Sequence, residues 1–140
     1  ESDAVGAYVS GGDYLTFTVT AGASAQVSLT ALEWYYGAGS AHEFETGIFS
    51  DAYEGFDASG DVIPGTYAYT HGTGYDVTKN RQVADLSLYP GFQNLTGTSV
   101  VFRSYMGDGA TYGNKFHRYD TIRVYALDMT PPAGTVFVVR

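Results

Sequence analysis

The amino-acid sequence predicts an all-β fold, a two-sheet antiparallel β-sandwich or jelly roll, on three observations. The 140 residues include 18 Gly, 13 Tyr and 8 Phe, a composition typical of strands joined by tight turns. Apolar and polar residues alternate with a period of two in several segments, as they do in half-buried strands. Gly, Pro, Asp and Ser interrupt these segments at short intervals, which favours a sandwich of many short strands.

The first two strands are expected at residues 14–19 and 26–36. In 14–19, apolar residues at every second position alternate with Tyr or Thr, which predicts one buried and one exposed face. The small residues of 22–24 form the turn. In 26–36 the phase of the alternation changes near Ala31 and Leu32, and this change predicts a β-bulge.

The later strands follow from the same alternation. Between residues 51 and 78 the pattern is least regular, because several Gly and Pro64 interrupt it. Pro90-Gly91 ends the strand expected at 83–89. The clearest signal is 99–106, in which Val100 and Phe102 face one way and Arg103 faces the other. The expected strands are 43–50, a short one near 66–69, 83–89 with Ala84, Leu86 and Leu88 on one face, 99–106, 119–127 and an edge strand at 136–139.

The chain is expected to form one domain over 1–140, with a core at about 13–127 and a C-terminal extension at 128–140. Its net charge of −8 and pI of about 4.5 argue against a nucleic-acid partner and against an anionic membrane surface. It contains no Cys, which excludes disulfides and thiolate metal sites. Because no apolar run approaches the roughly 20 residues of a membrane span, no membrane insertion is expected.

Three stretches carry a resemblance to a known group of domains. They are Asp13–Ala21 with Val27–Leu32, Ser50–Phe56, and Val101–Tyr105 with Tyr119–Val124. Together they resemble a jelly-roll carbohydrate-binding-module-like domain of secreted bacterial polysaccharide-degrading or surface proteins. The resemblance implies a secreted, extracellular or cell-surface setting, binding of a polysaccharide or oligosaccharide, and a monomeric module within a larger protein.

Aromatic and basic residues are the candidate ligand-binding groups. The run at 34–36 holds the only Trp, and Trp34 and Tyr36 share a strand face that a sugar ring could stack on, or that belongs to the core. Arg103 and Tyr105 share a face about 7 Å apart along their strand. An Arg fork suits sugar hydroxyls, uronates or sulfate esters, although an ion pair would also explain it. A Gly-rich loop and its flank add Tyr112, Asn114, Lys115, His117 and Arg118.

Metal binding is the weaker expectation for this chain. No cofactor is expected other than a structural Ca²⁺, because acidic side chains in irregular segments supply the oxygen ligands that Ca²⁺ takes. Turn-forming Asp residues that cap local N–H groups explain the same pattern. The candidate ligands from the irregular stretch are Asp57 and Asp61. The resemblance to jelly-roll modules, which often hold a structural Ca²⁺ near the chain ends, adds Asp13 and Asp120.

The sequence predicts a domain that is not an enzyme. Glu43 and Glu45 share a strand face, but every such pair on a strand has this spacing, about 7 Å. The three His residues are far apart in the sequence and lack metal-ligand spacing. The leading hypothesis is therefore a non-catalytic carbohydrate-binding module that targets an enzyme or a cell surface to an anionic or galactose-based glycan. The alternatives are a structural or adhesive spacer module and a small polysaccharide-cleaving enzyme.

Overall fold

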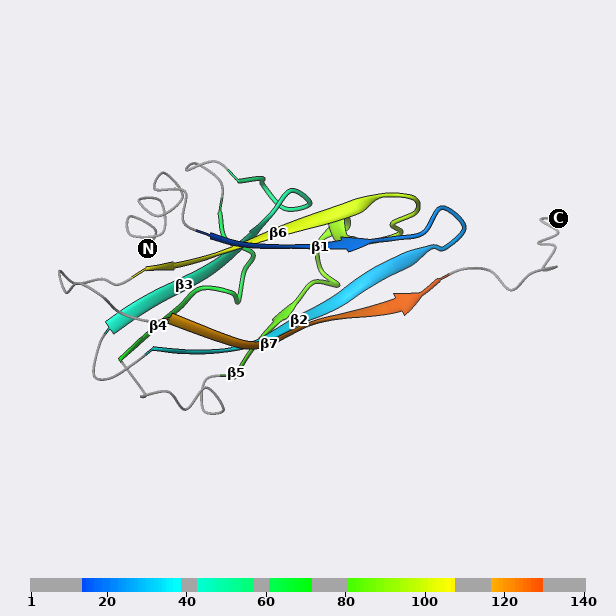
Figure 1. The fold of residues 1–140 in the computed structure, drawn as a ribbon. Helices are drawn as coiled ribbons and strands as arrows, with labels where there is room; N and C mark the ends of the chain where they lie inside the picture. Colours follow the sequence, from blue (N-terminus) through cyan, green and yellow to red (C-terminus); the bar gives the residue numbers. More distant parts are fainter. Residues whose placement is uncertain (1–13, 39–42, 57–60, 72–80, 108–116, 130–140) are drawn as a thin grey trace, which may run out of the picture.

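The structure, a computed structural model, describes residues 14–38, 43–56, 61–71, 81–107 and 117–129. Over these residues the chain forms seven strands in two antiparallel sheets that face each other (Figure 1). The strands are β1 (Tyr14–Thr20), β2 (Val27–Ala38), β3 (Glu43–Ser50), β4 (Ala68–His71), β5 (Arg81–Asp85), β6 (Ser99–Gly107) and β7 (His117–Asp128), with a 3₁₀ turn, η2 (Pro90–Phe92), before β6.

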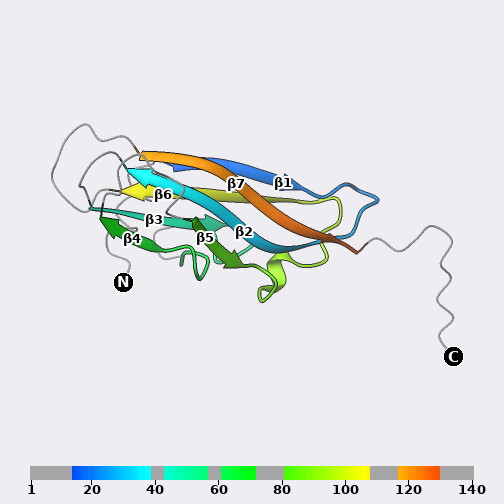
Figure 2. The same cartoon turned by 90° about the horizontal axis from the view of Figure 1, so that it is seen from below.

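One sheet has the strand order β1-β6-β3-β4 and the other has the order β5-β2-β7. In the view from below, β7 and β2 run side by side over much of their length (Figure 2). The all-β, two-sheet antiparallel sandwich predicted from the sequence is confirmed. The jelly-roll connectivity and the domain limits stay predictions.

Most predicted strands agree with the structure to within one or two residues. The bulge expected near Ala31 is confirmed, because the register of β2 against β7 shifts between Leu29 and Ala31. The prediction for 83–89 is wrong at its end. The side chain of Asp85 accepts hydrogen bonds from the backbone N–H and the hydroxyl of Ser87, and this turn ends β5. Leu88 is therefore 71% exposed, whereas Ala84 and Leu86, predicted to share its face, are buried. The strand expected at 136–139 lies outside the described residues.

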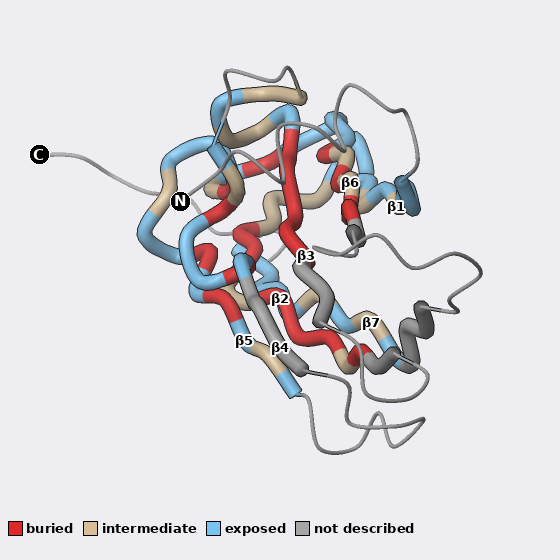
Figure 3. The backbone as a smooth tube through the Cα atoms, turned by 90° about the vertical axis from the view of Figure 1, so that its left-hand side faces the viewer, coloured by how far each residue is buried: buried red, intermediate tan, exposed pale blue. Residues whose placement is uncertain are grey.

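The core fills the space between the two sheets, and it is built from their inward-facing apolar side chains. Figure 3 shows buried backbone along β2 and β3, whereas the edge strands β1 and β7 are largely exposed. Phe102 lies at its centre, stacked on Phe17 at 4.9 Å between ring centroids and on Phe92 at 5.8 Å. Stacked rings add to the free energy gained by removing their apolar area from water.

The turn after β3 connects the core to the outer face of the four-stranded sheet. Ser50 is bridged to Gly55, whose φ of 86° is a backbone conformation that glycine adopts without strain. The Asp51 carboxylate accepts a hydrogen bond from the backbone N–H of Val101 on β6 at 2.9 Å. The bond between Asp51 and Val101 holds the turn against β6, and Phe56 follows at the end of the turn.

Candidate functional site

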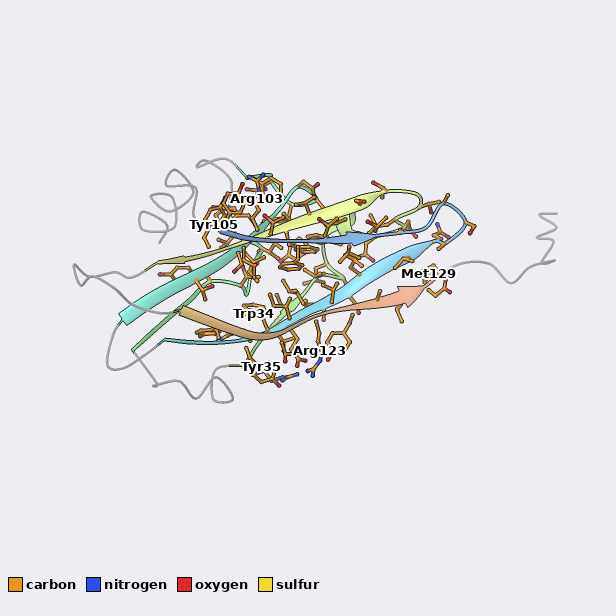
Figure 4. All side chains as sticks on the ribbon, viewed as in Figure 1. Trp34, Tyr35, Arg103, Tyr105, Arg123 and Met129 are labelled. Atoms are coloured by element: carbon orange, nitrogen blue, oxygen red, sulfur yellow. The ribbon has the colours of Figure 1, made fainter. Side chains whose placement is uncertain are left out.

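Trp34 and Tyr36 share a face of β2, as predicted, and that face is the core. Trp34 is 0% exposed and Tyr36 is 3% exposed, so neither ring offers a surface on which a sugar could stack. Figure 4 places Trp34 between the two sheets. The interpretation of this aromatic pair as ligand-binding is corrected, and the alternative that this face is buried core is the one the structure agrees with.

Arg103 and Tyr105 share the outer face of the four-stranded sheet, as the alternation predicted (Figure 4). Tyr105 is only 2% exposed, because Tyr14 and Phe49 pack against its ring at 5.4 and 5.2 Å. These rings form a second small hydrophobic cluster on the outer face of the sheet, so the Tyr105 ring does not offer a surface on which a ligand could stack.

Arg103 lies over two aromatic rings. Its guanidinium carbon is 4.6 Å from the ring centroid of Tyr14 and 4.1 Å from that of Phe56, in an arrangement that we call the Arg103 stack. Both contacts are cation–π interactions. Among the described residues, the buried Nε of Arg103 has no hydrogen-bond partner, and no ion pair with Arg103 is found. The guanidinium group of Arg103 is therefore engaged mainly in contacts with these two rings.

The remaining predicted residues are placed only in part. Asp61 is exposed, and its backbone N–H donates to the carboxylate of Glu54 at 3.2 Å. Within the described ranges no three His, Asp or Glu side chains form a group that could hold a metal ion. Tyr112, Asn114, Lys115, Asp13 and Asp57 lie outside the described residues, and for His117, Arg118 and Asp120 only the backbone, paired with β2, is described.

The most organised polar arrangement in the described chain lies on the outer face of the three-stranded sheet, and the sequence did not single it out. Glu33 on β2 has a side chain only 4% exposed. Arg81 of β5 donates from Nη2 to its Oε2 at 2.9 Å, and Arg123 of β7 donates from Nη1 to its Oε1 at 2.8 Å. The Tyr125 hydroxyl also donates to Oε2, at 3.0 Å. We call these four residues the Glu33 cluster.

Sheet register places the members of the Glu33 cluster together. Glu33 lies directly opposite Arg123 on β7, and Arg81 pairs with Tyr35, two positions further along β2. Because side chains two positions apart share a face, all of these groups project to the same outer side. Figure 4 shows Tyr35 and Arg123 below the sheet, on the side away from Trp34.

The electrostatics of the Glu33 cluster keep its carboxyl ionised. Hydrogen bonding from Arg81, assisted by Tyr125 and Arg123 and opposed by desolvation, lowers the pKa of Glu33 to about 2. The same carboxylate raises the pKa of both Arg residues. Glu33 is therefore a fixed anion at ordinary pH, and it cannot supply a proton to a reaction there.

The exposed parts of the cluster form a polar and aromatic surface. The side chains of Arg81 and Arg123 are 54% and 52% exposed, and Tyr125 is 45% exposed. Val83 and Leu127, at 45% and 57% exposure, extend this face with apolar area. We call this surface, made by the Glu33 cluster with Val83 and Leu127, the three-stranded face.

Comparisons with known proteins do not place the chain in a family. No protein-family model matches it, and neither a curated protein nor a solved structure matches it. Among the described residues, no helix has the length and the hydropathy needed to cross a membrane.

Proposed function

We propose that this protein is a non-catalytic carbohydrate-binding module that holds a secreted enzyme or a cell surface against a polysaccharide, and that it binds through the three-stranded face. The observation that carries the proposal is the Glu33 cluster, in which one buried carboxylate orients two half-exposed guanidinium groups and one half-exposed Tyr ring.

The chemistry of this face suits a sugar chain. Guanidinium N–H groups that do not bond Glu33 can donate to sugar hydroxyl or ring oxygens. The Tyr125 ring provides an amphipathic surface against which the C–H face of a sugar packs. Because Glu33 already fixes both Arg side chains, a ligand pays less of the rotamer entropy that binding usually costs.

The state of Glu33 supports a binding role over a catalytic one. A general acid for glycoside cleavage needs a raised pKa, whereas the pKa of Glu33 is lowered to about 2. Its two oxygens are also occupied by three hydrogen bonds from neighbouring side chains. In this proposal the carboxylate therefore orients the neighbouring side chains and does not react with a substrate.

A spacer module without a glycan site is the second candidate, and burial of the aromatic residues favours it. Trp34, Tyr36 and Tyr105 are all at most 3% exposed, which a spacer predicts. It also predicts that Arg103 is ion-paired, whereas within the described residues this side chain stacks on two rings instead. The two candidates differ in whether the three-stranded face binds a sugar chain.

Affinity electrophoresis against a panel of neutral and anionic polysaccharides tests the proposal. We expect at least one polysaccharide to retard the protein, and an Arg81→Gln/Arg123→Gln double variant to lose most of that retardation. Arg103→Gln on the opposite outer face is the control for the single variants Arg81→Gln and Arg123→Gln, because each of the three removes one positive charge. The proposal fails if no polysaccharide retards the wild-type protein, and also if the double variant behaves like the wild type.

A further inference from the structure

We infer that the three-stranded face selects a sugar that carries an anionic substituent, a carboxylate or a sulfate ester, and that this group binds between Arg81 and Arg123. The inference rests on the proposed function for the ligand being a glycan. It adds the chemical class of that glycan and the two residues that recognise it.

The first support is the charge balance of the Glu33 cluster. Two guanidinium groups surround one ionised carboxylate, so one positive charge is left without a counterion in the cluster. Asp85 lies on the same strand face, and its carboxylate accepts two hydrogen bonds from Ser87 in its own turn. Asp120 pairs with Tyr35 in the register of β2 and β7, and its side chain lies outside the described part of the chain. Asp85 is four residues from Arg81 along β5, or roughly 13 Å.

The second support is the number of free donors. A guanidinium group has five N–H donors in a planar fork. Glu33 contacts one terminal nitrogen of Arg81, Nη2, and one of Arg123, Nη1. Tyr35 also hydrogen-bonds to the Arg81 side chain. Since both Arg side chains are more than half exposed, the N–H groups that neither Glu33 nor Tyr35 bonds can donate to an oxyanion from solvent. Hydrogen bonds of this charge-assisted kind are about twice as strong as neutral ones.

The third support is the burial of Glu33. Its side chain is only 4% exposed and is covered by its partners, so an incoming anion adds to the cluster and does not displace the carboxylate. The net charge of −8 does not prevent such binding at physiological salt. Charges more than about 8 Å from the site are then largely screened, so the charges nearest to Arg81 and Arg123 have the largest effect.

Calorimetric titration of the full chain with three oligosaccharide probes at physiological salt tests the inference. The probes are a neutral galactan oligosaccharide, a sulfated galactan oligosaccharide of the same length and an oligogalacturonate. The two anionic probes separate a sulfate ester from a carboxylate as the source of the charge. Arg81→Gln and Arg123→Gln are the test variants, Arg81→Lys and Arg123→Lys retain the charge without the fork, and Arg103→Gln is the control.

We expect at least one anionic probe to bind tenfold or more tightly than the neutral probe. Each Gln variant should weaken that binding about fivefold to tenfold and weaken the neutral probe by a clearly smaller factor, because the neutral probe loses hydrogen bonds but no charge–charge attraction. Each Lys variant should recover part of the loss, and Arg103→Gln should change none of the affinities. A role confined to sheet stability would not separate charged from neutral probes in this way.

Two results overturn the inference, and they are distinguishable. If the neutral probe binds as tightly as both anionic probes, or if the Gln variants weaken all probes equally, the anion selectivity is wrong while glycan binding stands. If none of the three probes binds the wild-type protein and no polysaccharide retards it in electrophoresis, the proposed function fails together with the inference.

Discussion

The two outer faces of the sandwich hold their Arg residues by different means. On the four-stranded sheet, Arg103 lies over the rings of Tyr14 and Phe56, at 4.6 and 4.1 Å from their centroids. On the three-stranded sheet, Arg81 and Arg123 are held at their tips by the carboxylate of Glu33. A guanidinium group stacked on rings contributes to packing within the protein. One that is bonded through a single nitrogen still has N–H groups that can donate to a ligand.

The Tyr residues of the two faces also differ, in how far their side chains are exposed to solvent. Tyr105 is 2% exposed beneath its aromatic neighbours, whereas Tyr125 is 45% exposed and bonds to Glu33 through its hydroxyl. The four-stranded face is therefore a small extension of the core, and the three-stranded face is a surface with ordered polar groups. Substitutions on the two faces should affect different properties of the protein.

The largest effect on stability is expected on the four-stranded face. Tyr105→Ala removes a buried ring that packs against Tyr14 and Phe49, and it should lower the free energy of unfolding by about 3–5 kcal/mol. Chemical denaturation followed by the emission of Trp34 measures this loss. A loss below about 1 kcal/mol would show that the ring is not part of a packed cluster.

A smaller effect, which depends on pH, is expected for Glu33→Gln. The pKa of Glu33 is lowered to about 2 in the folded protein from its ordinary value of 4.5, so its ionised form stabilises the fold above pH 4.5. That contribution is lost as the pH falls from 4.5 towards 2. The wild type should therefore exceed Glu33→Gln in stability at pH 6, and the difference should shrink below pH 4.5.

Thermal unfolding of both proteins at several pH values between 2 and 6 measures this difference. Arg103→Gln serves as the control, because its stability relative to the wild type should not follow the titration of Glu33. A difference between wild type and Glu33→Gln that stays constant from pH 6 to pH 2 would contradict the ion pairing of this carboxylate.

Arg103→Lys is expected to cost about 1 kcal/mol, since an ammonium group keeps the charge but loses the planar contact with the two rings. Denaturation at neutral pH measures the cost, and binding to glycan probes should be unchanged. The Arg103 stack is refuted as a stabilising arrangement if the Lys variant is as stable as the wild type.

The smallest effect is expected for Tyr125→Phe. This substitution deletes one hydrogen bond to Glu33 at a half-exposed position and should cost about 0.5–1 kcal/mol. It should also raise the pKa of Glu33, because one of the groups that favour its ionised form is lost. The carboxyl carbon resonance of Glu33, followed by NMR through an acid titration, reports that change, and an unaltered titration would count against the bond.

Much of the fold could be predicted from local alternation, because strand period and turn residues are properties of neighbouring positions. The limits of 43–50 match β3, and the bulge in β2 was expected within a few residues. The end of β5 was missed, because the hydrogen bonds of Asp85 outweighed the alternation that continued to Leu88.

The candidate site was less predictable because it depends on strand order. The alternation of β7 puts Arg123 and Tyr125 on one face, but only the pairing of β2 with both β5 and β7 brings them to Glu33. The partners lie 48 to 92 positions from Glu33 in the sequence. The one local signal was a Glu in an otherwise apolar stretch of β2. The aromatic run that follows it, which begins at Trp34, was predicted to bind ligand instead, and the Trp34 side of that run is buried.

The most direct test of the account is a backbone amide NMR titration of the full chain with the oligosaccharide that binds best. The account predicts shift changes concentrated at residues 31–35 of β2, 81–85 of β5 and 121–127 of β7, with little change around Arg103. Shift changes centred on Arg103 and Phe56, or none at saturating sugar, would contradict the claim that the three-stranded face is the binding surface.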